Sequence, residues 1–339
     1  MDGMGMATNK ANESYANDAI SKIIANAVST FEDEPGFRKS TLHLGRTDSF
    51  IAANRRHLDK SSGKVIISTK DSILEDPTVG IVQFIDNKKQ ILATLINYAC
   101  HPVTLGPQST LISPDFVGKT REIVEKEWGG PCLFLNGAAG DINPKDGPRT
   151  DIERTNKIGT SLGKTVLDCD LFPVSISTVN FSRGSVKLPF EKQKIDMDFI
   201  KTETAKKKAM KPGFMGWNKK IDLWAIAQNK RIGLSETLGR ELEINVLRFG
   251  DIIFLFTPGE LFSSYHSILK TEFPEYQIFL IGYTNGESGY LPNKKAFELG
   301  GYEVEQAYVF FDEPSPLFHT SEEIYIKEAK RLINKVLFK

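Results

Sequence analysis

Along the 339-residue chain, apolar runs separated by polar turns alternate with segments of helical periodicity. Residues 79–86, VGIVQFID, and 91–100, ILATLINYAC, predict two strands joined by a polar turn. Residues 242–260, LEINVLRFGDIIFLFTPGE, hold two apolar runs on either side of Phe249-Gly250-Asp251 and predict a hairpin. The shorter apolar runs 132–137, CLFLNG, and 277–283, QIFLIGY, predict buried strands.

Apolar residues at helical spacing predict helices over residues 12–31, 114–128, 151–169, 261–273 and 321–337. In the first of these, Ile20, Ile23, Ile24, Ala27 and Val28 share one face. A Lys-rich and Met-rich segment at about 192–230 also has helical periods, and we expect it to be a helical insertion. The recurrence of strand, loop and helix predicts an α/β fold with a central mixed β-sheet flanked by helices, and we expect residues 1–339 to form a single domain.

Polar loops follow four of the predicted strands, at NYAC|HP, FLNG|AAGDINP, FLFT|PGE and LIGY|TNGES. If these strands lie side by side, the four loops meet at one edge of the sheet. Loops at strand ends are where α/β proteins place binding and catalytic groups. We therefore expect an active site in the loops at these strand ends.

Composition and charge exclude several classes of function. Lys and Arg number 43, as do Asp and Glu, so no global basic field favours nucleic acid as a partner. Three cysteines without a CxxC pair exclude a disulfide scaffold and a cysteine-based zinc module. No apolar run is long enough for a transmembrane segment. The polar N-terminus carries no signal peptide, so the expected location is cytoplasmic, or secreted if the true N-terminus lies upstream; the oligomeric state stays open.

Each loop offers groups that can carry chemistry. His101, a carboxylate such as Glu260 and one further oxygen ligand, from separate strand ends, could hold zinc with an open position. Such a metal acidifies water and polarises a carbonyl. Plainer interpretations stay open: a hydrogen-bonded loop histidine for His101, and a favourable charge at a helix N-terminus for Glu260. The tyrosines Tyr290 and Tyr302 are equally consistent with packing.

Longer motifs carry a resemblance. INYACHPVTLGPQSTLISPDFVG followed by PCLFLNGAAGDINP resembles the neutral/alkaline (non-lysosomal) ceramidase family. TPGEL resembles that family's Pro-Gly-Glu zinc motif, and GYTNGESGYLPNKKAFELGGYE resembles its tyrosine loop, with Tyr290 and Tyr302 twelve positions apart. GRTDSFIAANRR resembles a segment with an arginine near the active site, matched here by Arg46. The similarity extends in order from about residue 12 to residue 303.

The resemblance implies roles for individual residues. His101, Glu260 and Tyr290 would be ligands of a Zn²⁺ cofactor, Tyr302 would donate to the oxyanion formed on the amide carbonyl, and Arg46 would contact the substrate. The implied reaction is hydrolysis of the N-acyl linkage of ceramide or a related small, lipid-like amide. The implied function is therefore that of a zinc-dependent amidohydrolase.

The chain also departs from the family pattern. The family has a further zinc histidine upstream, whereas this chain has no histidine before His43. We therefore expect an N-terminally truncated version of the catalytic domain, and one that lacks the family's C-terminal immunoglobulin-like domain. Asn143 stands where ceramidases have a serine, so attack would use metal-activated water, with Asp141 as a possible base. The alternative is a catalytically degenerate ceramidase-like protein that binds a ligand or partner.

Overall fold

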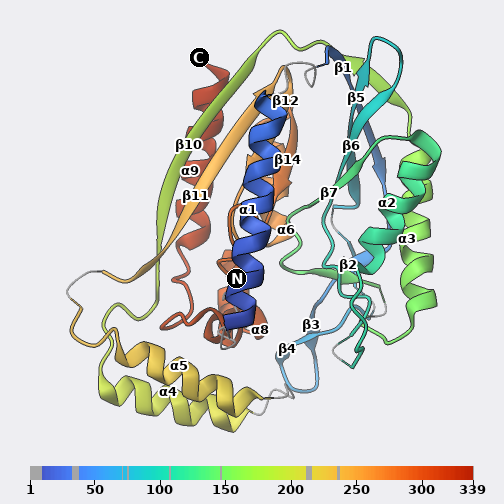
Figure 1. Ribbon diagram of the computed structural model, residues 1–339. Coiled ribbons are helices and arrows are strands. Elements are labelled where there is room, and N and C mark those ends of the chain that lie inside the picture. The colour runs from blue at the N-terminus through green and yellow to red at the C-terminus, as the bar shows by residue number, and fades with distance from the viewer. Residues whose placement is uncertain are drawn as a thin grey trace.

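The apolar strands assemble into two main sheets that pack face to face, with helices on both outer faces (Figure 1). The computed structural model describes residues 10–32, 38–70, 72–74, 76–106, 108–145, 147–210, 216–234 and 237–338. The α/β class predicted from the sequence is confirmed, but the strands are divided between two stacked sheets and do not form one central sheet.

The first sheet has the strand order β7-β6-β5-β1-β9. Its strands are β1 (Ser40–Asp48), β5 (Thr78–Asp86), β6 (Ile91–Tyr98), β7 (Cys132–Asn136) and β9 (Leu171–Val174). β5 and β6 pair antiparallel across the predicted turn, whereas β6 and β7 run parallel. The second sheet has the order β10-β11-β12-β14. It contains β10 (Val179–Pro189), β11 (Gly239–Phe249), β12 (Ile252–Phe256) and β14 (Gln277–Ile281).

The predicted hairpin is present, since Phe249 of β11 faces Ile252 of β12. β12 and β14 run parallel, which gives the second sheet the same mixed character as the first. Three hydrophobic clusters hold the layers together. One lies between the two sheets, including Leu42 and Phe254, and the others lie between each sheet and its helices.

Helices α2 (Asp115–Trp128) and α3 (Ile152–Leu167) cover the first sheet, while α6 (Ser263–Glu272) and α9 (Ser321–Leu337) contribute to the core beside the second. The Lys-rich segment forms two helices, α4 (Met197–Met210) and α5 (Trp217–Asn229). The shorter elements are β2 (Ala52–Asn54), β3 (Arg56–Asp59), β4 (Lys64–Ile67), β8 (Ile142–Pro144), β13 (Glu260–Leu261), β15 (Tyr290–Leu291), α7 (Lys294–Leu299), α8 (Tyr302–Glu305) and the 3₁₀ helix η2 (Ala307–Phe311).

The two sheets are joined where β7 approaches β14. The backbone N–H of Gly282, after β14, donates to the carbonyl of Asn136 at the end of β7 (3.0 Å). The Asn97 side chain donates to a carbonyl of each strand, Leu135 and Leu280. These bonds bring the ends of β6, β7 and β14 together although the strands belong to different sheets.

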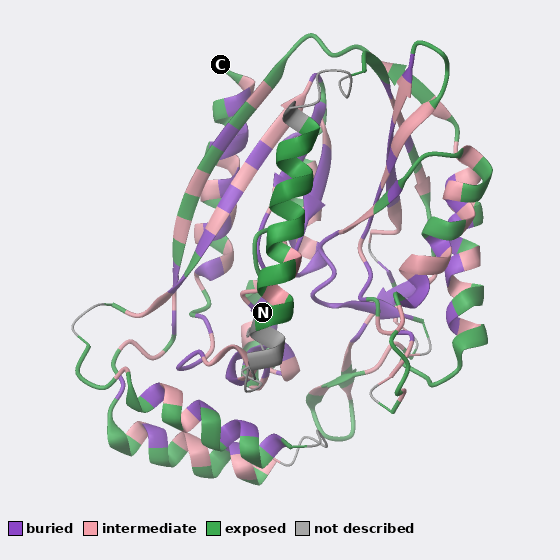
Figure 2. Cartoon of the chain, in the orientation of Figure 1, coloured by how far each residue is buried: buried purple, intermediate pink, exposed green. Residues whose placement is uncertain are grey.

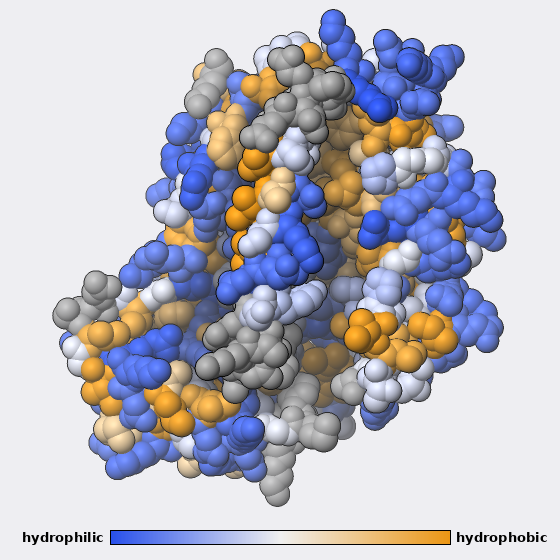
Figure 3. All heavy atoms as spheres, viewed as in Figure 1, coloured by the Kyte–Doolittle hydropathy of each residue, from blue (hydrophilic) through white to orange (hydrophobic). Residues whose placement is uncertain are grey.

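Helix α1 (Lys10–Glu32) forms where its periodicity predicts, but its apolar face is not buried. Ile20, Ile23, Ile24 and Val28 are about half exposed or more, and the helix is green over most of its length in Figure 2. In Figure 3, apolar side chains border the hollow beside this helix. Within the described ranges, no helix has both the length and the apolar character needed to cross a membrane.

Candidate active site

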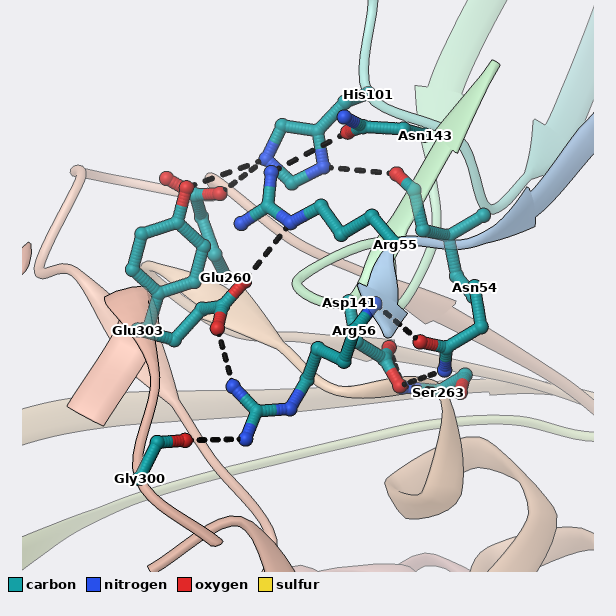
Figure 4. Close-up of polar contacts among 12 residues, drawn as sticks. Asn54, Arg55, Arg56, His101, Asp141, Asn143, Glu260, Ser263, Gly300 and Glu303 are labelled. Carbon is teal, nitrogen blue, oxygen red and sulfur yellow. Dashed lines mark hydrogen bonds and ion pairs between the residues drawn. The ribbon is translucent and has the colours of Figure 1, made fainter. Parts of the chain in front are cut away.

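His101 follows β6 and is fixed by a single backbone carbonyl. Its backbone N–H and its Nδ1 both contact the carbonyl oxygen of Ile142, at 3.1 and 3.0 Å. Because a carbonyl can only accept, Nδ1 carries a proton, so Nε2 is the ring nitrogen that can offer a lone pair to a metal. Nε2 lies 2.5 Å from Oε2 of Glu260 (Figure 4).

Glu260 and Tyr290 are partners in the short parallel sheet formed by β13 and β15. This pairing aligns two residues thirty positions apart, and the Tyr290 hydroxyl lies 3.4 Å from His101 Nε2. Gly259 precedes Glu260 with a φ of +92°, and a Cβ there would lie 2.6 Å from the carbonyl of Gly289. The Pro-Gly-Glu order therefore has a local cause, because only glycine allows β13 and β15 to approach this closely.

These three side chains suit a metal ion. With Nδ1 protonated, Nε2 and the Glu260 carboxylate are two acceptors facing each other, an arrangement that needs a cation or a proton between them. A histidine whose other nitrogen donates to a carbonyl is typical of zinc ligands. Two ligands of one tetrahedral zinc lie about 3.4 Å apart. The Tyr290–His101 separation has this value, whereas Glu260 would have to move away from His101. His101 and Tyr290 therefore fit the ion as they lie, and Glu260 fits it after this shift.

The candidate ligand set depends on the tyrosine. In the described part of the chain, no group of three or more His, Cys, Asp or Glu side chains is arranged to hold a metal. His101 and Glu260 supply only two such ligands, so the Tyr290 oxygen is needed as the third.

The charges around these residues are unequal. Burial opposes ionisation of Glu260, but His101 and Arg55 more than compensate and hold the pKa of its carboxyl below the usual range. Burial raises the pKa of the Tyr290 hydroxyl well above its usual range, which keeps it a neutral phenol in the absence of a metal. The site thus combines the Glu260 carboxylate anion with the neutral phenol of Tyr290 and the nearby Arg55 cation.

Arg55 is a site residue that the sequence reasoning missed. Its guanidinium is buried, its Nε donates to Glu303 (2.9 Å), and it lies 5.2 Å from the centroid of the Tyr290 ring. Burial opposes the charge, yet Tyr290 and Glu303 raise the pKa of Arg55 above its usual range. Arg56 also donates to Glu303 and, through Nη2, to the carbonyl of Gly300 (2.6 Å). The two arginines therefore share one buried carboxylate.

Tyr302 lies on the same side of the site as Arg55. Its ring packs edge-on against Tyr290 at 5.8 Å and lies 6.0 Å from the Arg55 guanidinium. Burial raises the pKa of Tyr302 to about 12, so its hydroxyl keeps its proton at neutral pH. It can therefore act as a hydrogen-bond donor.

The segment Asp141-Ile142-Asn143 connects these parts. The Ile142 carbonyl holds His101, and the Asn143 Oδ1 accepts a hydrogen bond from Arg55 Nη1 (3.3 Å). The Asp141 carboxylate accepts from the backbone and hydroxyl of Ser263 (2.7 and 3.0 Å) and from Asn54 (2.9 Å). Burial raises the pKa of Asp141. In Figure 4 this carboxylate lies beside Ser263 and Asn54, apart from His101.

Arg46 lies elsewhere. It is an exposed residue of β1, and its guanidinium donates to the hydroxyl of Thr78 (3.2 Å). Arg55 lies beside Tyr290 and Tyr302 instead. It belongs to the same motif as Arg46, GRTDSFIAANRR, nine residues further along the chain. The signal that could have identified it is its place directly after β2, which pairs with β8 and so with Asn143.

Two further residues border the site without having been predicted. The Tyr283 hydroxyl hydrogen-bonds Glu260, and burial raises its pKa above the usual range. Glu287 lies close enough to Glu260 for the two charges to interact; burial and this repulsion raise the pKa of Glu287 to about 7. Glu287 belongs to the TNGES loop, whose polar residues the sequence had marked only as a group, and Tyr283 directly precedes that loop.

The fold is similar to that of solved ceramidases. A neutral ceramidase from Pseudomonas aeruginosa matches 87% of this chain with a TM-score of 0.56 and 13% identity. A ceramidase complexed with C2 matches with the same TM-score and identity. The chain spans about half the length of these proteins, 52% and 54% respectively. No family model and no curated protein matches the sequence.

Proposed function

We propose that this protein is a zinc-dependent hydrolase that cleaves an N-acyl amide bond, in ceramide or a related lipid-like amide. One observation carries the proposal: the Glu260 carboxylate and the Tyr290 hydroxyl lie 2.5 and 3.4 Å from Nε2 of His101. The similarity of the fold to that of a solved neutral ceramidase supports it.

His101, Glu260 and Tyr290 would hold the ion. Bound there, zinc would polarise the amide carbonyl and bring the pKa of a water molecule near neutrality. The chain's own part is to present Nε2 of His101 to the ion, which the Ile142 carbonyl secures by accepting a hydrogen bond from Nδ1–H. β13 and β15 hold the two oxygen ligands in register.

Negative charge develops on the carbonyl oxygen during amide hydrolysis, and two groups can stabilise it. Tyr302 keeps its proton and can donate it in a hydrogen bond, while Arg55 supplies a permanent positive charge. Both flank the Tyr290 ring, so both would lie beside a substrate held at the metal. Fixed donors of this type contribute about 10²–10³ in rate in other hydrolases.

Asn143 and Asp141 take positioning roles in this proposal. The Asn143 amide has no nucleophilic oxygen of the kind a serine offers, and it accepts a hydrogen bond from Arg55. The Asp141 carboxylate is engaged by Ser263 and Asn54, which leaves it poorly placed to take a proton from water. Attack by water without a covalent acyl intermediate follows from the absence of a nucleophile at position 143.

The test is release of dodecanoic acid from N-dodecanoylsphingosine by zinc-loaded protein. We expect turnover by the wild type and its loss in Glu260→Gln, while Glu241→Gln, an exposed substitution on β11, retains full activity. Lack of turnover on this substrate and on simpler N-dodecanoyl amides would contradict the proposal. So would equal turnover by Glu260→Gln.

A further inference from the structure

A second cavity, separate from the site above, lies under the helical pair of the Lys-rich segment. It has a volume of about 440 Å³ and is bounded by α4 on one side and by the segment from Phe297 to Tyr308 on the other. A cavity of this size falls in the range that holds small organic ligands. Figure 1 shows α4 and α5 packed together at the end of the molecule that carries α8.

The polar centre of this cavity is Lys207, whose side chain is only 3% exposed. Its ammonium group donates to the carbonyl of Glu305 and lies 4.8 Å from the centroid of the Tyr308 ring. It forms a long ion pair with the Glu203 carboxylate, 4.0 Å away, and that carboxylate also accepts a hydrogen bond from the Tyr308 hydroxyl. An ammonium carries three N–H donors, so this one has capacity for a further acceptor.

The energetics agree with this geometry. Burial lowers the pKa of Lys207 to about 8, which shows that the surroundings destabilise its charge. The charges of Glu203 and Glu305 oppose this lowering without cancelling it. Glu305 also accepts through Oε2 from the backbone N–H of Gly301 (3.0 Å). An anion placed against Lys207 would therefore gain a charge-assisted hydrogen bond in a poorly solvated position.

Part of the remaining wall is carbon surface against which an apolar chain can pack, formed by Phe199, Met210, Phe297, Val304 and Pro316. Glu191 and Ser315 add polar groups to the rest of the lining. At the edge, Lys192 places its ammonium 4.8 Å from the Phe199 ring centroid, and Lys206 adds another exposed cation. The cavity thus pairs a buried cation with an apolar body.

We propose that this cavity is a binding site for an aliphatic carboxylate, with the carboxylate on Lys207 and the chain against the apolar walls. The site shares one segment with the candidate active site. Gly300, Val304 and Glu305 line the cavity, while Tyr302 and Glu303 of the same segment face the arginines. The proposal does not rest on the hydrolase function, because it requires neither zinc nor turnover.

The experiment is a calorimetric titration of sodium decanoate into the metal-free, full-length protein, followed in parallel by tryptophan fluorescence. Trp217 reports on the site, because its indole N–H donates to the carbonyl of Lys207 (2.8 Å). We expect one saturable site. Since a hydrogen bond to a charged group is lost, we expect affinity to fall at least about tenfold in Lys207→Met. The variant Lys201→Met, an exposed position on α4 outside the cavity lining, should change it by no more than about twofold.

Two comparisons keep the result interpretable. 1-Decanol has the same chain without the charge, and we expect it to bind at least about tenfold more weakly to the wild type. This comparison needs no variant, so it decides the matter even if Lys207→Met fails to fold. Glu260→Gln should bind decanoate normally, which places the ligand outside the candidate active site. Absence of saturable binding, equal binding of decanol, or unchanged affinity in a folded Lys207→Met would each overturn the proposal.

Discussion

The buried group Arg55–Glu303–Arg56 gives a prediction that can be worked through from the structure. The Glu303 side chain is 1% exposed and accepts from both guanidinium groups, whose side chains are 6% and 9% exposed. Glu303→Gln keeps the shape and one acceptor oxygen but removes the carboxylate that the two arginines share. Two buried cations then lie close together without their counter-charge.

The size of the effect follows from burial. Removing one partner of a buried ion pair costs about 3–5 kcal/mol, and the remaining amide oxygen places this case near the lower end, at about 3 kcal/mol. With about 2.1 cal/mol/K of unfolding entropy per residue, a 339-residue chain changes its Tm by about 1.4 °C per kcal/mol. We therefore expect Glu303→Gln to lower Tm by about 4 °C in a thermal unfolding experiment.

A matched control is available on β11. Glu243 pairs with Arg183 at the surface, where the two side chains are 31% and 65% exposed, so Glu243→Gln makes the same chemical change to a much less buried carboxylate–arginine pair. It should leave Tm nearly unchanged, because exposed pairs are screened by water and salt. If the two variants melt together, the buried arginines do not depend on Glu303 for charge compensation and the argument fails.

Two further predictions concern the support of the site and the stability in acid. Gly140→Ala would place a Cβ 2.5 Å from the carbonyl oxygen of Glu260, so we expect it to displace β13. The affinity for zinc, measured by chelator competition, should then fall by about tenfold or more. An unchanged affinity would show that β13 tolerates the methyl group. Burial opposes ionisation of Asp76, but His266 and Lys270 outweigh this effect and lower the pKa of Asp76 below its value in the unfolded chain, about 3.9. The stabilising contribution of the Asp76 carboxylate is therefore complete above pH of about 3.9 and is lost as the pH falls. The free energy of unfolding, measured in urea between neutral pH and pH of about 3, should therefore become more similar for Asp76→Asn and the wild type as the pH falls. A constant difference in this free energy across that range would refute the assignment.

Much of the fold could be predicted because local patterns determine it. The turn after Asp86 and the hairpin at Phe249-Gly250-Asp251 are signalled by short-range sequence, and both occur. The division of the strands into two stacked sheets could not be predicted, since an apolar run does not say which strand pairs with which. Helix α1 shows the same limit: its periodicity gives the helix, but nothing in it says whether another element covers Ile23 and Ile24.

The site was predictable only in part, for a related reason. His101, Glu260 and Tyr290 follow strand ends, and the structure brings them together through β13, β15 and the Ile142 carbonyl. Arg55 lies near them because β2 pairs with β8, a contact between segments almost ninety positions apart. No spacing rule distinguishes Arg55 from Arg46 in one motif, so the long-range pairing had to be seen.

The most direct test of the central claim is a titration of zinc into metal-stripped protein, comparing the wild type with Glu260→Gln. The account predicts one zinc ion per wild-type chain. Because loss of groups that merely orient a zinc ligand already costs 10- to 100-fold, loss of a ligand itself should weaken binding by at least about a hundredfold. A wild-type protein that binds no zinc, or a Glu260→Gln variant that binds it equally well, would contradict the account.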